Sequence, residues 1–117
     1  MNNLNQIILK KFLTKLGYEP DFAADGLEAI SALKLKDYDI IYMDGQMPEL
    51  DGYEATKRIR KEFDKEKQPW IIACTASTSE EDKKRSRDSG MDDFIGKPIS
   101  LTTLVQSLNN ADTGINS

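Results

Sequence analysis

The chain has 117 residues, of which 38% are hydrophobic and 31% charged, which suits a single domain with a core of its own. Its 20 acidic and 16 basic residues give a net charge of −4, which argues against nucleic-acid binding, and no apolar run is long enough for a membrane-spanning helix. The absence of histidine and the single cysteine, Cys74, exclude disulfides, imidazole-ligated zinc and histidine bases. A cytoplasmic location is expected, with chemistry carried by carboxylates, hydroxyls and lysine.

The first part of the chain is predicted to alternate between helix and strand. Apolar residues at helical spacing favour a helix over residues 4–16, ended by Gly17. A short strand is predicted over residues 19–23, and an acid three residues before a glutamate marks the start of a second helix near Gly26. The apolar run at residues 39–43 has the length expected of a strand that is covered on both faces.

The second part of the chain continues the alternation. The predicted elements are a helix opening at Gly52, a strand over 70–74, a helix over 79–89 closed by Gly90, a strand over 93–96 and a helix over 101–108. The helix over 79–89 carries no apolar residue, so it is expected to bury little and to be among the least stable parts of the fold. The domain is predicted to span residues 1–108, followed by a disordered tail over 109–117.

Helices alternating with strands at this spacing predict a doubly wound α/β fold with a parallel sheet. Ligands in such folds bind outside the carboxyl ends of the strands, where this sequence places Asp44, Thr75 and Lys97. Each residue alone is an ordinary cap, turn or solvated residue. Together they offer a carboxylate nucleophile, a hydroxyl and an ammonium group, which is the equipment for handling a phosphoryl group.

Four segments carry a resemblance to a known family. The sequence resembles the receiver domain of two-component response regulators, of the type found in hybrid histidine kinases and phosphorelays, through KLGYEPDFAADGLEAI, DIIYMDGQMPELDGYEATKRIR, IIACTAS and GMDDFIGKPIS. This resemblance covers about residues 2–108. It implies a flavodoxin-like sheet and a signalling domain that is not an enzyme and whose partner is a histidine kinase or a histidine phosphotransfer protein.

The resemblance also implies a role for each matching residue. Asp44 would be the phosphoacceptor, Thr75 the switch hydroxyl, Lys97 the phosphoryl-binding lysine and Phe94 the switch aromatic. The carbonyl of Gln46 would join Asp44 as a ligand of magnesium, the cofactor of the family.

One departure from the family pattern concerns the start of the domain. Receivers begin with a strand that ends in two acids, and the alignment places Met1 at the second acid position, with no residue for the first. The resemblance therefore implies a receiver fold without its first, central strand and with an incomplete magnesium site. Magnesium binding and phosphorylation of Asp44 are expected to be weak or absent.

The missing strand leads to a further expectation about assembly. A sheet without its central strand would expose an apolar edge and leave the first helix without its anchor, so a homodimer formed through that helix is expected. Pairing of the 19–23 strand with the 39–43 strand is the monomeric alternative.

Two alternative functions stay open at this point. The domain could be a pseudo-receiver that mediates protein contacts or dimerisation without phosphorylation. A phosphohydrolase with an aspartyl nucleophile is less well supported, because that class needs a second acid two residues after the nucleophile and Gln46 stands there.

Overall fold

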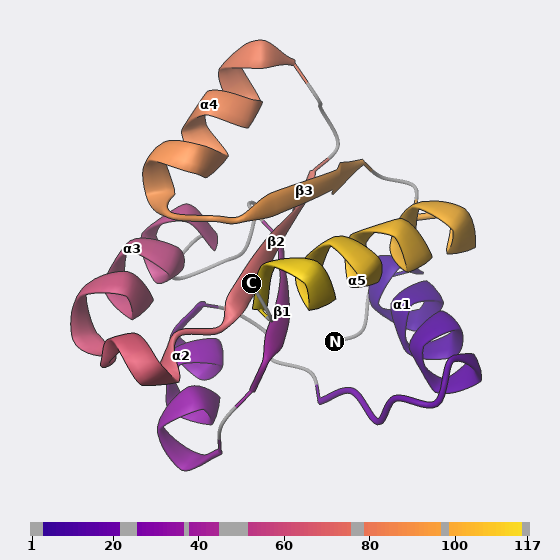
Figure 1. Ribbon diagram of the computed structural model, residues 1–117, viewed down its shortest axis with the longest axis horizontal. Coiled ribbons are helices and arrows are strands. Elements are labelled where there is room, and N and C mark those ends of the chain that lie inside the picture. The colour runs from indigo at the N-terminus through magenta and orange to yellow at the C-terminus, as the bar shows by residue number, and fades with distance from the viewer. Residues whose placement is uncertain are drawn as a thin grey trace.

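In a computed structural model, the residues whose placement is described form three parallel strands at the centre of the molecule (Figure 1). The structure describes residues 4–21, 26–36, 38–44, 52–75, 79–96 and 99–115. The strands are β1 (Ile40–Asp44), β2 (Trp70–Thr75) and β3 (Asp93–Gly96), in the order β1-β2-β3. The helices are α1 (Leu4–Lys15), α2 (Gly26–Leu35), α3 (Gly52–Glu62), α4 (Glu80–Ser89) and α5 (Leu101–Ile115), with a 3-10 turn at Lys65–Lys67.

Helices cover both faces of the sheet, so the predicted doubly wound α/β fold is confirmed (Figure 1). Side chains of β2 alternate between two buried clusters: Ile71 packs with residues of α2 and α3, and Ile72 packs with residues of α1 and α5. This alternation follows from the two-residue period of a strand. Both faces are apolar because both are covered, as the continuous apolar runs indicated.

Local signals set the ends of α4. The Ser79 hydroxyl accepts a hydrogen bond from the Asp82 amide at 3.3 Å, and Gly90 adopts a left-handed conformation with φ 102°. Serine is a preferred N-cap, and glycine reaches positive φ without steric cost. The predicted end of this helix and both bounds of the 93–96 strand are confirmed, and the helix begins one residue later than predicted, at Glu80, with Ser79 as its cap.

The strand predicted over residues 19–23 is wrong for Glu19, Pro20 and Asp21, which lie in irregular backbone, and residues 22 and 23 fall outside the described part. Proline has no amide proton to donate to a ladder. The Tyr38 hydroxyl donates to the Asp21 carboxylate at 2.6 Å, which fixes this segment near the approach to β1 through side chains.

The disordered tail predicted from residue 109 is also wrong as far as Ile115, because α5 continues to that residue. Ala111 is fully buried, and Gly114 approaches the ring of Trp70 so closely that a Cβ there would overlap it. Ala111 lies seven residues after Leu104, so the apolar stripe of the helix does continue beyond 108.

The first helix is packed within the same chain. Leu9 and Leu13 are 9% and 8% exposed and belong to the cluster that contains Leu104 of α5. Within the described residues, β1 pairs with β2 alone, so its other edge carries no described strand. None of the helices that the structure describes has the length and apolar character needed to cross a membrane.

Candidate functional site

The three strand ends lie together at one edge of the sheet. In the parallel register, Asp44 stands opposite Cys74 and Thr75 stands opposite Gly96, the residue that directly precedes Lys97. The main chain at Asp44 and Thr75 and the end of β3 therefore share the carboxyl edge, as expected from the strand order. In folds of this class, that edge is where ligands bind.

The reactive groups of this edge lie outside the described residues. The structure describes the backbone of Asp44 and Thr75 but not their side chains, and it does not describe Gln46 or Lys97. It does show that the backbone of Asp44 and the backbone of Thr75 lie at the ends of neighbouring, hydrogen-bonded strands. The roles that the resemblance implies for these four residues stay predictions.

Phe94, the candidate switch aromatic, is described in full. It lies in β3, is partly buried and packs against the cluster formed with α2 and α3. The ammonium group of Lys83 in α4 lies over its ring, 5.1 Å from the centroid. The sequence analysis did not identify Lys83, because it expected the helix over 79–89 to bury little. The sequence did contain an indication of such a contact: a helix without apolar residues has to dock through its polar and charged side chains.

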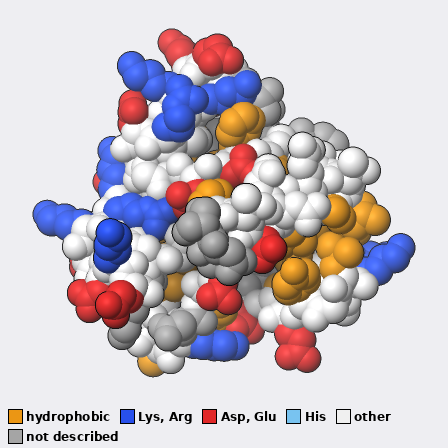
Figure 2. Space-filling view, viewed as in Figure 1, with side chains coloured by type: hydrophobic (Ala, Val, Ile, Leu, Met, Phe, Trp, Pro, Cys, Tyr) orange, Lys and Arg blue, Asp and Glu red, His pale blue; other side chains and the backbone are white. Residues whose placement is uncertain are grey.

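Helix α4 makes a second contact of the same kind. The Arg85 guanidinium lies 4.1 Å from the centroid of the Tyr53 ring in α3. Ser86 and Ser89 are buried and donate to backbone carbonyls four residues earlier, at 3.0 and 2.8 Å. Basic side chains gather at the α4 end of the molecule in Figure 2. The helix thus lies between β3 and α3 and is held there mainly by polar groups.

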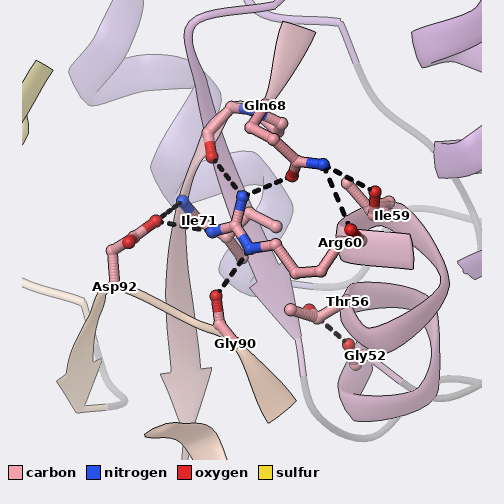
Figure 3. Close-up of polar contacts among 9 residues, drawn as sticks. Gly52, Thr56, Ile59, Arg60, Gln68, Ile71, Gly90 and Asp92 are labelled. Carbon is pink, nitrogen blue, oxygen red and sulfur yellow. Dashed lines mark hydrogen bonds and ion pairs between the residues drawn. The ribbon is translucent and has the colours of Figure 1, made fainter. Parts of the chain in front are cut away.

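A cluster of hydrogen bonds around Arg60 fixes the far end of α4 (Figure 3). Its guanidinium donates to the carbonyl of Gly90 at 2.8 Å, to Gln68 Oε1 at 2.7 Å, to the carbonyl of Pro69 at 2.9 Å and to Asp92 Oδ2 at 2.7 Å. Arginine suits this task because its planar fork presents several fixed donors. Nothing in the sequence pattern had marked Arg60, since it is one of four basic residues in a charged helix.

Tyr42 of β1 lies on the face of the sheet that α1 and α5 cover, and its pKa is shifted. The hydroxyls of Tyr42 and Ser107 share a hydrogen bond of 2.8 Å between β1 and α5. Burial raises the pKa of Tyr42 to about 12, although the hydrogen bond with Ser107 acts in the other direction. Cys74 is buried on the same face, in the cluster that contains Ile72.

Comparison with known sequences defines the class to which this fold and edge belong. The family model of the response regulator receiver domain matches residues 2–109. The chain belongs to this family, and it is a receiver domain of two-component phosphorelay signalling.

Curated relatives are much longer proteins. The chain is 41% identical over 117 residues to hybrid signal transduction histidine kinase K of Dictyostelium discoideum, covering 94% of this chain and 10% of the relative. It is 44% identical over 103 residues to the autoinducer 2 sensor kinase/phosphatase LuxQ of Vibrio parahaemolyticus, covering 88% and 12%. The chain therefore spans about a tenth of the length of these relatives.

Solved structures resemble the whole domain. The receiver domain of the sensor histidine kinase PA1611 from Pseudomonas aeruginosa, which holds a magnesium ion in its active site cleft, is 35% identical with a TM-score of 0.82, covering 93% of this chain and 88% of that one. A chain from the co-crystal of the Saccharomyces cerevisiae phosphotransfer protein Ypd1 with the Ssk1 receiver domain is 35% identical with a TM-score of 0.82, covering 91% and 79%.

Proposed function

We propose that Asp44 accepts a phosphoryl group from a phosphohistidine of a histidine kinase or a histidine phosphotransfer protein. The observation that supports this proposal is the alignment of the ends of β1, β2 and β3: the backbone of Asp44 and of Thr75 lies along one edge with Gly96, the residue that precedes Lys97 in the sequence. The similarity to a chain from a co-crystal of a phosphotransfer protein and a receiver supports the kind of partner.

The proposed reaction is one phosphoryl transfer. A carboxylate oxygen of Asp44 forms a bond to phosphorus while the bond from phosphorus to the histidine nitrogen breaks, giving an aspartyl phosphate and a free imidazole that takes up a proton. Such a transfer depends mainly on positioning and on neutralising the charge of the phosphoryl oxygens. The ammonium of Lys97 would neutralise part of that charge, and the hydroxyl of Thr75 would donate a hydrogen bond to it.

The groups proposed for this site are of the chemical type that binds magnesium. The carboxylate of Asp44 and the carbonyl of Gln46 are hard oxygen ligands, which magnesium prefers. When bound, the ion would add positive charge beside the phosphoryl oxygens. We propose that the 117-residue polypeptide holds magnesium and accepts phosphate weakly, because only one carboxylate of this chain is assigned to the site.

Treatment with a small-molecule phosphodonor and magnesium tests the function. The intact mass should rise by one phosphoryl group in the wild type and should not rise in Asp44→Asn. Asp39→Asn is the matched control, since Asp39 is an exposed acid just before the opposite end of the same strand. Equal labelling of wild type and Asp44→Asn would refute Asp44 as the acceptor. Absence of labelling in all three, even with a phosphohistidine donor, would favour a phosphorylation-independent interaction module.

The choice of reporter follows from the fold. Trp70 begins β2, whereas Thr75 ends it, so the indole lies at the far end of the strand from the proposed site. Because six residues of strand span roughly 17 Å, indole fluorescence is a poor probe of phosphorylation. The amide signals of residues 79–96, which include Phe94, are the better choice.

Homodimerisation is a separate proposal. The feature that supports it is the free edge of β1 within the described residues, and not the first helix. Leu9 and Leu13 already have partners within the chain, so exchange of α1 is no longer required. The edge of β1 that faces away from β2 pairs with no described strand, and open edges recruit further strands. Light scattering after size exclusion would detect the dimer.

A cytoplasmic location is also proposed, because the composition of the chain favours it.

A further inference from the structure

The contact between Lys83 and Phe94 joins the helix of lowest apolar content to the candidate switch aromatic. Lys83 lies four residues into α4, and its ammonium is 5.1 Å from the centroid of the Phe94 ring. The Lys83 side chain is 29% exposed, so its stem is largely covered. Its charged partner on the helix is Glu80, at 3.6 Å, which is 87% exposed. The lysine thus points toward β3, while its carboxylate partner is open to solvent.

The physical effect of this contact is to favour one position of the ring. A cation above an aromatic face is attracted by the negative charge density of that face, and the attraction is lost when the ring turns edge-on or swings away. Lys83 is partly desolvated, which strengthens the attraction relative to a fully exposed lysine. The ring also packs against the buried cluster that includes residues of α2 and α3. Phe94 therefore contacts both an apolar cluster and a cation.

Apolar packing by its own side chains does not anchor the first half of α4. The helix sequence, EEDKKRSRDS, contains no apolar side chain, and only Ser86 and Ser89, both in its second half, are buried. Its end is fixed by the hydrogen bond from Arg60 to the Gly90 carbonyl. Movement of Phe94 and movement of the first turns of α4 are therefore coupled through Lys83.

We infer that Lys83 is a positioning residue for Phe94: its ammonium holds the ring in the observed orientation and links that orientation to the placement of α4. This inference deepens the proposed function and rests on it where Phe94 is taken as the switch aromatic. It adds a regulatory residue to the site, because any change that removes the charge of Lys83 would release the ring.

The ring orientation can be measured directly in unphosphorylated protein. Three-bond couplings in phenylalanine-labelled protein give the χ1 rotamer populations of Phe94. Lys83→Met keeps much of the stem and removes the charge, and it should shift the rotamer ratio about two- to fivefold, the range that a partly exposed cation–π contact supports. Lys83→Arg restores a cation and should return the ratio to the wild-type value.

Lys84→Met is the matched control, because Lys84 is the exposed neighbour on the same helix and its substitution removes the same charge. Lys84→Met should leave the Phe94 ratio unchanged. The inference is overturned if Lys83→Met leaves the ratio unchanged, if Lys84→Met shifts it equally, or if Lys83→Arg fails to restore it. Failure of Asp44 to accept a phosphoryl group would refute the proposed function and leave this result standing, since the rotamers are measured without phosphate.

Discussion

Arg60 of α3 and Asp92, just before β3, form an ion pair of 2.7 Å although they are 32 residues apart in the sequence. The same Asp92 oxygen accepts the backbone amide of Ile71 at 2.9 Å, so one carboxylate joins α3, β2 and the approach to β3. Both side chains are partly covered, with 24% and 30% exposed. A charged pair in such a place needs its full set of hydrogen bonds, since a single missing partner leaves a desolvated charge.

Replacement of Arg60 should therefore lower stability far more than its charge alone suggests. We expect Arg60→Met to reduce the free energy of unfolding by about 2 to 4 kcal/mol, because Asp92 and three other acceptors lose their donor. Urea unfolding followed by circular dichroism measures this. Arg58→Met, at an exposed position of the same helix, should change stability by less than about 0.5 kcal/mol. Equal losses of unfolding free energy in the two variants would show that the hydrogen bonds of Arg60 do not stabilise the fold.

Two glycines allow the contribution of this cluster to be separated from backbone strain. Gly90 and Gly17 both have positive φ, 102° and 96°, but a Cβ on Gly90 would meet Arg60 Cγ at 2.8 Å, whereas a Cβ on Gly17 would meet nothing within 4 Å. Gly17→Ala should cost about 1 kcal/mol for the left-handed conformation alone. Gly90→Ala should cost at least about 1 kcal/mol more, since the hydrogen bonds of Arg60 keep its stem in place. Similar losses would show that Arg60 moves freely.

The end of α5 should contribute to stability although the sequence pattern did not mark it. Removal of residues 109–117 deletes the fully buried Ala111 and uncovers the Trp70 ring, so we expect a loss of about 1 to 3 kcal/mol and a red shift of indole emission. Removal of residues 116 and 117 alone is the control and should do neither. If the variant that ends at residue 108 kept the indole emission and the unfolding midpoint of the full chain, the prediction of a disordered tail would be supported.

The burial of Tyr42 predicts a loss of stability at high pH. Its pKa of about 12 lies above the ordinary tyrosine value of 10.0, so the folded state binds the phenolic proton more tightly than the unfolded state. This contribution is fully present below pH 10 and is lost as the pH rises through 12. The effect should be of the order of 1 kcal/mol, because solvent screens the part of the ring that is exposed.

Comparison with Tyr42→Phe separates the contribution of Tyr42 to stability from the contributions of other groups that titrate at high pH. The variant leaves Ser107 its hydrogen bond to the Leu104 carbonyl at 2.7 Å. The difference in unfolding free energy between wild type and variant should narrow from pH 10 to pH 12. A constant difference over that range would rule out a perturbed Tyr42.

The parts of the fold that the sequence predicted well are those whose signals are local. Ser79 and Gly90 mark the ends of α4 through capping chemistry, and the apolar run of β2 shows that both of its faces are covered. The strand predicted over residues 19–23 depended on a partner strand, which no local pattern supplies. The continuation of α5 was missed because Ala111 and Gly114 are small, and small residues look neutral in a periodicity even where close packing requires them.

The candidate site was predictable to a similar extent. Strand ends follow from apolar runs, so the common edge of Asp44 and Thr75 could be inferred from the order of elements alone. The contact of Lys83 with Phe94 could not, because it depends on how a polar helix lies across the edge of the sheet. Arg60 was hidden for the same reason: its acceptors lie outside its own helix, in residues 68–69 and in residues 90–92.

The way α4 is attached gives it a response to conditions that differs from that of the sheet. Apolar packing weakens on cooling and strengthens with structure-promoting salts such as sulfate, because it depends on water. Contacts of Lys83 and Arg85 with aromatic faces are electrostatic, so added sodium chloride weakens them and cooling does not. Ionic strength therefore acts as a separate control on this one helix: amide exchange in α4 should quicken with salt while β2 stays protected.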